Sequence, residues 1–434
     1  MKKIIFIVIA FCCIHHCYSQ AKINVANTSL PLQQVKPEAA GFSSERLKRI
    51  DNNIMQWVND GHTTGAVALI VRNGKIVYHK AFGYDALEKT KPMRTDNIFR
   101  IASQTKAITS VAVMMLYEEG KFLLDDPVSR YIPEFAKQQV LDSFIAKDSS
   151  YTTIPAKSEV TIRQLLTHTS GIGYAQFGNK EAIAIFAKGG LSSGLGVEQS
   201  RRLEADIKKI GKLPLMHQPG ERFTYGLNTD VLGYLVEVTS GMSLDQFFKT
   251  RIFEPLGMHD TYFYLPESKY NRLVTLHEEV DHKLQKASRE IKHNGILLTD
   301  YPVTKGTYFS GGAGLSSTAL DYAIFLQMLL NGGQFNGKRL LSRNAVRMMT
   351  MNQIADINFG VNKMGLGFGI TSEKGSSILP TPEGVFEWAG GFATHYWADP
   401  KENLIGILYR QIWNTTQWEA GTKFKVLVYQ ALND

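Results

Sequence analysis

Apolar positions first repeat at helical spacing just after the first forty residues. Four apolar residues of this stretch lie three or four positions apart: Leu47, Ile50, Ile54 and Trp57. That spacing puts them on one face and predicts an amphipathic helix over about 44–58. Two strand-like runs follow at 66–72 and 75–84, and Asn73-Gly74 separates them. Asn-Gly between two apolar runs is the strongest short-range signal for a β-hairpin.

The middle and the end of the chain differ in texture. Residues 121–280 are predicted to be mostly helical, with loops. Strand-like runs return later, at 386–388, 395–398 and 404–409. A last helix is predicted over about 416–432. The predicted strands therefore come from the two ends of the chain.

These patterns predict an α+β fold. The simplest layout is one sheet built from both chain ends, with helices around it and a helical region inserted between. We expect one large domain over 43–434. Its α/β part takes about 43–120 and 281–434, and its helical insert takes about 121–280. A chain of this length can bury an ordinary hydrophobic core.

The start of the chain reads as a targeting segment. Met1-Lys2-Lys3 precedes an apolar stretch at 4–14, and small residues lie near Ser19. A basic start, a short apolar stretch and small residues near the cleavage point are typical of a secretory signal peptide. The apolar stretch is too short to span a membrane. We therefore expect a signal peptide over 1–19, an extended leader over 20–42, and a periplasmic or secreted protein.

Cysteine usage narrows the chemistry. The three cysteines, Cys12, Cys13 and Cys17, all lie inside the predicted signal peptide. The mature chain would then contain no thiol. Disulfides, thiolate nucleophiles and cysteine metal sites are excluded together.

Charge narrows the class of partner. The formal net charge is +8, and removing Lys2 and Lys3 with the signal peptide leaves +6. The basic residues are scattered, and the densest runs are Arg201-Arg202 and Lys208-Lys209. No basic stripe with interleaved aromatics is visible, which argues against nucleic acid as a partner. No second apolar stretch reaches membrane-spanning length, so we expect a small-molecule substrate and no membrane span.

The pattern that carries chemistry is Ser103-Gln104-Thr105-Lys106, at the start of a helix predicted to end near Glu119. Residues at i and i+3 share one helix face, so the amine stands close to the hydroxyl. A serine hydroxyl becomes a nucleophile when a neighbouring base takes its proton. The pattern is short, and Ser19-Gln20-Ala21-Lys22 also fits it without any expected catalytic meaning. Its weight therefore depends on its companions.

Three further motifs accompany it in order along the chain. They are Leu-Leu-Thr-His-Thr-Ser-Gly at 165–171, Pro-Gly-Glu-Arg-Phe-Thr-Tyr at 219–225 and Gly-Gly-Ala-Gly-Leu-Ser-Ser-Thr at 311–318. With them the chain resembles the penicillin-recognising serine hydrolases, the group of class C β-lactamases, D-alanyl-D-alanine carboxypeptidases and family VIII esterases. The resemblance covers about residues 40–430. It implies a β-lactamase/transpeptidase-like fold, a mainly antiparallel sheet flanked by helices plus an all-helical region.

The resemblance also implies roles for single residues. Ser103 would be the nucleophile, Lys106 its activating partner, and Tyr225 the proton acceptor and donor. The backbone N–H groups of Ser103 and Gly391 would form the oxyanion hole. The third motif of the family, on a strand that lines the site, would here be Trp388-Ala389-Gly390, which makes Trp388 and Gly390 substrate-binding residues. The implied reaction is acyl transfer through an acyl-enzyme, with no cofactor.

Two departures from the family pattern decide the expected substrate. Strict members carry Tyr-x-Asn at the second motif, whereas Asn228 here comes one place late after Tyr225 and should point elsewhere. Many members carry Lys or His where this chain has Trp388, and a tryptophan cannot bind a substrate carboxylate as a cation does. Trp-x-Gly, and the spacing from Tyr225 to Asp230, resemble the esterase branch. We therefore expect an ester or amide substrate whose acyl group needs no carboxylate.

Other interpretations stay open. The protein could be a β-lactamase or a D-Ala-D-Ala carboxypeptidase, or a binding or sensor protein that is acylated once and turns over poorly. Tyr225 and Trp388 could be ordinary packed aromatics. Gly190-Leu191-Ser192-Ser193-Gly194 fits the Gly-x-Ser-x-Gly elbow of another hydrolase class, but a predicted helix precedes it where that elbow needs a strand, so we expect a loop.

Histidines complete the list of candidates. His168 lies in a Thr/Ser/Gly turn and is expected to bond backbone groups rather than act as a base. His395 follows the third motif and is left undecided between surface and site. His277-Glu278-Glu279-Val280-Asp281 lacks the second histidine of a zinc helix, so no metal site is predicted.

Overall fold

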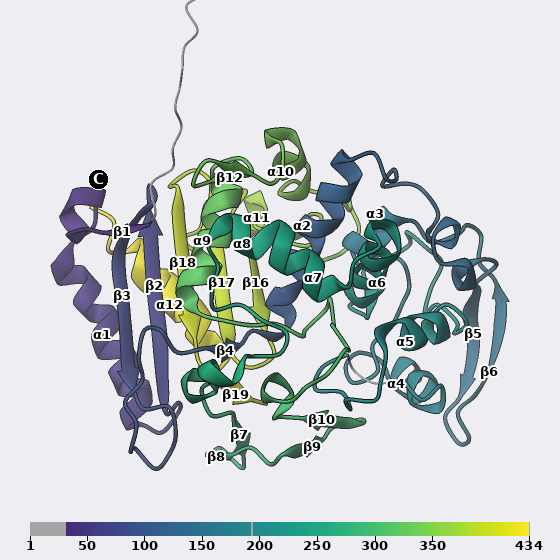
Figure 1. The fold of residues 1–434 in the computed structure, drawn as a ribbon, viewed down its shortest axis with the longest axis horizontal. Helices are drawn as coiled ribbons and strands as arrows, with labels where there is room; N and C mark the ends of the chain where they lie inside the picture. Colours follow the sequence, from purple (N-terminus) through teal and green to yellow (C-terminus); the bar gives the residue numbers. More distant parts are fainter. Residues whose placement is uncertain (1–31, 192–193, 434) are drawn as a thin grey trace, which may run out of the picture.

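Strands from both ends of the chain form one eight-stranded sheet, on the left in Figure 1. The computed structural model describes residues 32–191 and 194–433. The strand order is β1-β3-β2-β18-β17-β16-β15-β14, and every neighbouring pair is antiparallel except β1 with β3. The strands are β1 (Gln33–Gln34), β2 (Gly65–Arg72), β3 (Lys75–Gly83), β14 (Lys363–Met364), β15 (Gly369–Ile370), β16 (Phe386–Gly390), β17 (Thr394–Asp399) and β18 (Leu404–Tyr409). The predicted sheet and its N-terminal hairpin are confirmed.

Helices cover both faces of this sheet. They are α1 (Ser44–Asn59), α2 (Thr105–Glu118), α9 (Ala319–Leu330) and α12 (Glu419–Tyr429). Alternate residues of β2 face opposite sides, as the period of two in a strand requires. Leu69 lies in the larger hydrophobic core together with α2 and α9, and Ala68 lies in a second core with α1 and α12. The predicted α+β layout is therefore a sheet between two pairs of helices.

Much of the helical region lies on the right side of Figure 1, and its last two helices cross the centre of the view. Its helices are α3 (Ile162–Leu166), α4 (Lys180–Lys188), α5 (Leu203–Ile210), α6 (Asn228–Ser240), α7 (Leu244–Phe248) and α8 (Glu254–Leu256). A π-helical turn, Lys249–Phe253, joins α7 to α8. Leu232 of α6 and Phe247 of α7 belong to the same core as the sheet residue Leu69. The helical region and the sheet therefore share one continuous core.

The structure adds a hairpin that the sequence patterns do not predict. Strands β5 (Gln139–Ile145) and β6 (Ser150–Pro155) pair antiparallel inside the stretch expected to be helices and loops. Most of their residues are exposed or half-buried. Because few of these side chains face a core, apolar and polar residues do not alternate clearly along the two strands, and the sequence gives only a weak strand signal. Tyr151 and two threonines do favour a strand.

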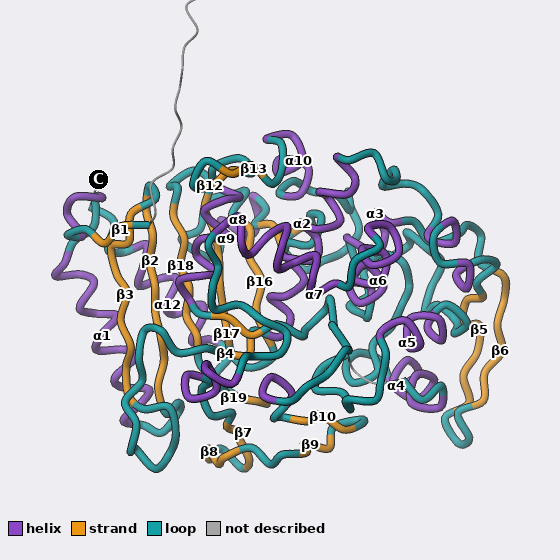
Figure 2. The backbone as a smooth tube through the Cα atoms, in the orientation of Figure 1, coloured by secondary structure: helices purple, strands orange, loops and turns teal. Residues whose placement is uncertain are grey.

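Short strands and helices fill the connections, several of them along the lower edge in Figure 2. These elements are β4 (Phe99–Arg100), β7 (His277–Val280), β8 (Lys283–Lys286), β9 (Glu290–Lys292), β10 (Ile296–Leu298), β11 (Ser316–Ser317), β12 (Gln334–Phe335), β13 (Lys338–Arg339), α10 (Arg343–Met349), α11 (Glu373–Ser376) and β19 (Ile412–Trp413). Strand β4 pairs with β11, and this pair lies directly before the Ser103 segment. The β4–β11 pair therefore holds the chain just before the turn that leads into α2.

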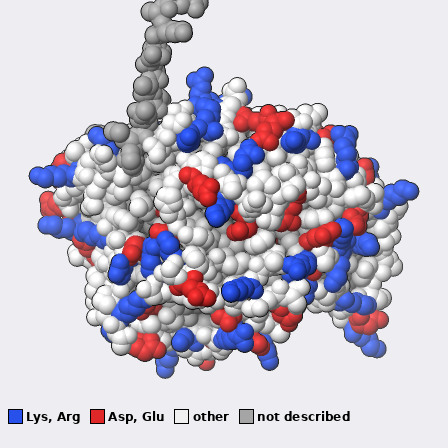
Figure 3. Space-filling view, viewed as in Figure 1, with Lys and Arg blue, Asp and Glu red and all other residues white. Residues whose placement is uncertain are grey.

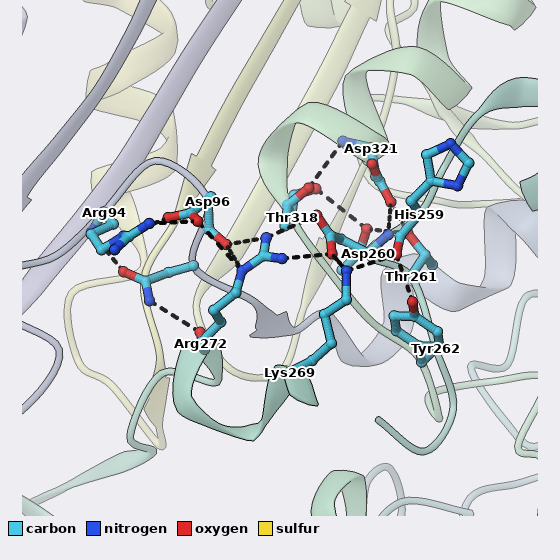
Figure 4. Close-up of polar contacts among 12 residues, drawn as sticks. Arg94, Asp96, His259, Asp260, Thr261, Tyr262, Lys269, Arg272, Thr318 and Asp321 are labelled. Carbon is cyan, nitrogen blue, oxygen red and sulfur yellow. Dashed lines mark hydrogen bonds and ion pairs between the residues drawn. The ribbon is translucent and has the colours of Figure 1, made fainter. Parts of the chain in front are cut away.

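A polar network centred on Asp260 holds distant segments together (Figure 4). The Asp260 carboxylate accepts hydrogen bonds from the Arg272 guanidinium at 2.7 and 2.8 Å and from Lys269 at 2.5 Å. Arg272 also donates to the Asp96 carbonyl at 2.6 and 2.9 Å. The Asp260 N–H donates to Asp321 in the first turn of α9 at 2.7 Å. The network ties the segment before β4 to the start of α9.

The N-terminal leader is partly folded. Residues 1–19, the predicted signal peptide, lie outside the described residues. Strand β1 extends the edge of the sheet, and Phe42 is fully buried. The Arg72 guanidinium donates to the Ala40 carbonyl at 3.2 Å. The last part of the stretch expected to be an extended leader therefore packs onto the domain.

Charged side chains of both signs are intermingled on the face shown in Figure 3. This agrees with the scattered basic residues of the sequence. No helix in the described ranges, 32–191 and 194–433, is long and apolar enough to cross a membrane.

Candidate active site

Ser103 stands on a tight turn between β4 and α2. The first turn of the predicted helix is a 3-10 turn, Ala102–Gln104, and the α-helix proper begins at Thr105. Ala102 has a φ of 44°, in the left-handed region that a residue with a Cβ rarely occupies. Such strain costs on the order of 1–3 kcal/mol and tends to be kept at functional sites. The turn leaves the Ser103 side chain half-buried.

Two polar side chains, those of Tyr225 and Lys106, meet at Ser103 Oγ. The Tyr225 hydroxyl donates a hydrogen bond to Ser103 Oγ at 2.7 Å. The Lys106 Nζ lies 3.4 Å from the same oxygen and donates to the Gly312 carbonyl at 2.8 Å. It also lies 4.8 Å from the centre of the Tyr225 ring. The structure thus brings together Ser103, Lys106 and Tyr225, the three residues for which the sequence predicts catalytic roles.

A buried carboxylate, Asp230, holds the loop that binds Lys106. Asp230 is 1% exposed, and it accepts hydrogen bonds from Ser310 Oγ at 2.6 Å and from the Gly312 N–H at 3.3 Å. These bonds fix the loop whose Gly312 carbonyl binds Lys106. Burial raises the pKa of Asp230, and the positive charge of Lys106 opposes that rise. Asp230 therefore positions the lysine through the loop.

Close packing and hydrogen bonds hold the Tyr225 segment. A Cβ on Gly226 would lie 1.9 Å from the Ile172 carbonyl oxygen, so only glycine fits there. His168 Nδ1 accepts from the Gly226 N–H at 3.4 Å and from the Asn228 side chain at 3.0 Å. Burial and the charge of Lys106 hold the pKa of His168 well below its usual range. His168 therefore accepts a backbone hydrogen bond, as expected, and the Asn228 side chain points to it.

Strand β16 brings the predicted third motif beside the Ser103 turn. A Cβ on Gly390 would lie 2.2 Å from the Ile101 carbonyl oxygen, so glycine permits this close approach. Strand β15 pairs only with Phe386 and Glu387, which leaves the outer edge of residues 388–390 without a strand partner. Within residues 32–191 and 194–433, the N–H groups of Ser103 and Gly391 have no acceptor. Both donors remain available to a substrate.

Two groups of aromatic rings extend from Tyr225. In the first, the half-buried Trp388 ring lies 6.0 Å from the Tyr225 ring. The Trp388 ring also lies 6.3 Å from the Phe359 ring, and these two ring planes are parallel to within 1°. Phe223 lies 4.6 Å from Phe359. These three residues, Trp388, Phe359 and Phe223, are called the Trp388 group below. They make an apolar wall where strict family members would place a cation.

The second group is reached through Tyr174, whose ring stacks on the Tyr225 ring with centres 5.6 Å apart. The Phe177 ring lies 5.3 Å from the Tyr174 ring. Phe177 lies 6.0 Å from Trp413 and 5.8 Å from His293. These three residues, Phe177, His293 and Trp413, are called the Phe177 group. Sequence reasoning missed it, since no motif marks aromatic residues that lie so far apart along the chain.

The remaining candidates are His395 and the serines at 192 and 193. His395 pairs with Ala389 across β16 and β17, on the face opposite Trp388, where its ring packs against Gly421 of α12. Burial, with the charges of Arg410 and Lys425, lowers the pKa of His395 to about 3. Among the ring contacts of the described residues, its partner is Trp418, with ring centres 6.0 Å apart. The rival serines 192 and 193 lie outside the described residues, but helix α4 comes before them as expected.

Comparisons with known proteins agree with this architecture. A family model described as Beta-lactamase matches residues 50–428. Esterase EstB of Burkholderia gladioli is 30% identical over 83% of this chain and 89% of its own length. A putative D-alanyl-D-alanine carboxypeptidase of Escherichia coli K12 is 29% identical over 83% of this chain and 81% of its own. The solved structure of EstCE1, described as a hydrolase with promiscuous acyltransferase activity, covers 90% of this chain and 99% of its own, with a TM-score of 0.75 at 24% identity.

The fold and the matching family model define a serine hydrolase of the β-lactamase/transpeptidase-like fold. The chain belongs to the beta-lactamase family, as its motifs suggested.

Proposed function

We propose that this protein is a secreted carboxylesterase that acts through an acyl-enzyme on Ser103. One observation carries the choice of ester over penicillin-like substrate: the Trp388 group builds an apolar wall beside Tyr225. A tryptophan offers a large apolar surface and one N–H donor, and it cannot pair with a carboxylate as a lysine does. The relationship to EstB supports the same choice.

Acylation follows from the positions of three side chains. Ser103 Oγ attacks the ester carbonyl carbon, and its proton passes to the Tyr225–Lys106 pair, which lies within 2.7 and 3.4 Å. The carbonyl oxygen takes up negative charge, and the N–H groups of Ser103 and Gly391 stabilise it. In the reactive state Tyr225 is the phenolate that accepts this proton, and the Lys106 ammonium stabilises its negative charge. The pair then protonates the departing alcohol oxygen as its C–O bond breaks.

Deacylation uses the same groups in reverse. Water attacks the acyl carbon of acyl-Ser103 and gives its proton to the Tyr225–Lys106 pair. The pair returns that proton to Ser103 Oγ as the carboxylic acid leaves. No cofactor or metal takes part in this scheme. Asp230 acts only by holding the Gly312 loop against Lys106.

A substrate panel tests the proposal. Purified protein is assayed with short p-nitrophenyl esters and with a chromogenic cephalosporin, and Ser103→Ala serves as control. We expect fast ester hydrolysis, little or no cephalosporin turnover and no activity in Ser103→Ala. Fast cephalosporin hydrolysis with inert esters would instead favour a β-lactamase, and release of D-alanine from a D-Ala-D-Ala peptide would favour a carboxypeptidase.

Two further measurements separate the remaining alternatives. Mass spectrometry of the protein after ester treatment should show no lasting adduct. A persistent acyl group without repeated turnover would point to a binding or sensor protein. Ser192→Ala should keep activity, since helix α4 rather than a strand precedes it in the chain. Loss of activity there, with Ser103→Ala active, would overturn the assignment of the nucleophile.

Secretion is tested separately. If the signal peptide is cleaved after Ser19, the mature protein from the periplasm or the medium begins at Gln20. Mass spectrometry of the intact protein from each cell fraction measures this directly. An uncleaved chain found in the cytoplasm contradicts this part of the proposal.

A further inference from the structure

The two aromatic groups of the site lie at different places along β16. Trp388 stands three residues before Gly391, which is about 10 Å at 3.3 Å per strand residue. Beyond Gly391 the nearest side-chain atom to its Cβ position belongs to Trp413, at 3.8 Å. An ester bound along the open edge of β16 can therefore place one half against the Trp388 group and the other against the Phe177 group.

The catalytic groups fix which half goes where, and this step rests on the function proposed above. The carbonyl oxygen points to the N–H groups of Ser103 and Gly391. The alcohol oxygen must reach the Tyr225 hydroxyl, which protonates it. The Tyr225 ring contacts Trp388 directly, at 6.0 Å, whereas its ring contacts lead to the Phe177 group only through Tyr174, at 5.6 Å. The alcohol half therefore leaves along the Trp388 side. The acyl substituent takes the remaining direction, past Gly391 toward Trp413.

The Phe177 group is an aromatic corner. Its rings meet pairwise with centres 5.8 to 6.0 Å apart, and His293 and Trp413 stand nearly perpendicular, at 81°. Trp413 is buried, whereas Phe177 is 36% exposed and so presents its ring to the surface. The corner is held together because the Asn294 side chain donates to the Gln176 carbonyl at 3.1 Å, which keeps the loop of His293 against Phe177.

Flat aromatic groups pack best against such a corner, by offset stacking and edge-to-face contact. We propose that the Phe177 group is the acyl pocket, and that the preferred substrates are esters of carboxylic acids that carry an aromatic ring. Phe177 sets the preference for the acid, and Phe359 of the Trp388 group contacts the alcohol. The two halves of the substrate are thus selected by different aromatic residues.

The test uses two p-nitrophenyl esters with the same alcohol and different acids, acetate and phenylacetate, on wild type, Phe177→Ala and Phe359→Ala. We expect the wild type to prefer the phenylacetate. Phe177→Ala should lower kcat/KM for phenylacetate at least tenfold more than for acetate, because apolar contacts of this size discriminate roughly 10–200-fold. Phe359→Ala should affect both esters alike. Leu123→Ala, which also removes an exposed apolar side chain, is the matched control and should change neither ratio.

Deacylation gives an independent readout. The acyl-enzyme has lost the alcohol, so Phe177→Ala should change its rate of breakdown in burst kinetics, whereas Phe359→Ala should change only the burst phase. If Phe359→Ala alters the acid preference or the breakdown rate, or if Phe177→Ala changes both esters equally, the assignment of the two pockets is wrong. If the wild type hydrolyses neither ester, the proposed esterase function itself fails.

Discussion

At the scale of single residues, the groups around Ser103 come from near and distant parts of the chain. Ser103 and Lys106 are three residues apart, and their closeness follows from the geometry of one helical turn. Tyr225 reaches the same hydroxyl across 122 residues of chain, and the Gly312 carbonyl reaches Lys106 across 206. The sequence could propose Tyr225 only by resemblance to a family. It could not propose the Gly312 carbonyl or Tyr174 at all.

The tyrosine makes a residue-scale prediction. Tyr225→Phe removes the hydroxyl that donates to Ser103 Oγ and keeps the ring against Trp388. Because that hydroxyl moves the proton in both steps, we expect kcat for a p-nitrophenyl ester to fall about 10²–10⁴-fold with KM little changed. Steady-state kinetics measure this. Tyr262→Phe, which removes a hydroxyl bonded to the His259 carbonyl outside the site, should keep full activity. A Tyr225→Phe enzyme with normal kcat would remove Tyr225 from the mechanism.

At the scale of elements, the helices and strands with strong apolar patterns were predicted well. The helix at 44–58 and the strands β2, β3, β16, β17 and β18 agree with the patterns within a few residues. The hairpin of β5 and β6 was missed because its residues are largely exposed, so burial leaves little trace in its sequence. The structure also corrects the start of the predicted helix: Ser103 lies in a 3-10 turn, and α2 begins after it.

An element-scale prediction concerns the start of α9. Burial raises the pKa of Asp321 to about 6, from 3.8 for the free carboxyl. The folded protein therefore binds this proton more tightly than the unfolded chain does, so stability falls as pH rises from about 4 to about 6, by roughly 1–3 kcal/mol. Asp321→Asn can still accept from the Asp260 N–H and should remove this part of the decline.

Thermal unfolding followed by circular dichroism between pH 4 and pH 7 measures the effect of Asp321→Asn. The difference in melting temperature between variant and wild type should move in favour of the variant as pH rises. The exposed Asp356→Asn is the matched control and should show a constant difference. A pH-independent difference for Asp321→Asn would show that this carboxyl does not titrate in that window.

At the scale of the whole molecule, the sheet and the helical region are joined by a single large core. Side chains from β2, α2, α6, α7 and α9 belong to one hydrophobic cluster. The proposed catalytic groups also come from both parts, with Ser103 beside the sheet and Tyr225 in the helical region. We therefore propose that residues 43–434 behave as one domain, and that the insert at 121–280 does not fold alone.

Calorimetry tests this. We expect one thermal transition, with equal calorimetric and van't Hoff enthalpies, because unfolding either part exposes the core of the other. The activity with a p-nitrophenyl ester should be lost at the same temperature. Two separated transitions, or a folded fragment of residues 121–280, would show that the parts are independent.

The sequence by itself determined the patterns that local geometry controls: the amphipathic helices, the Asn-Gly hairpin, and the serine and lysine on one helical turn. It also identified the family, since several motifs in order are specific together. The tertiary structure alone decided which distant groups surround Ser103. Aromatic rings from residues 174 to 413 meet there because the folded chain brings them together, and no spacing along the sequence encodes such contacts. The acid and alcohol preferences that we propose for the site depend on those contacts.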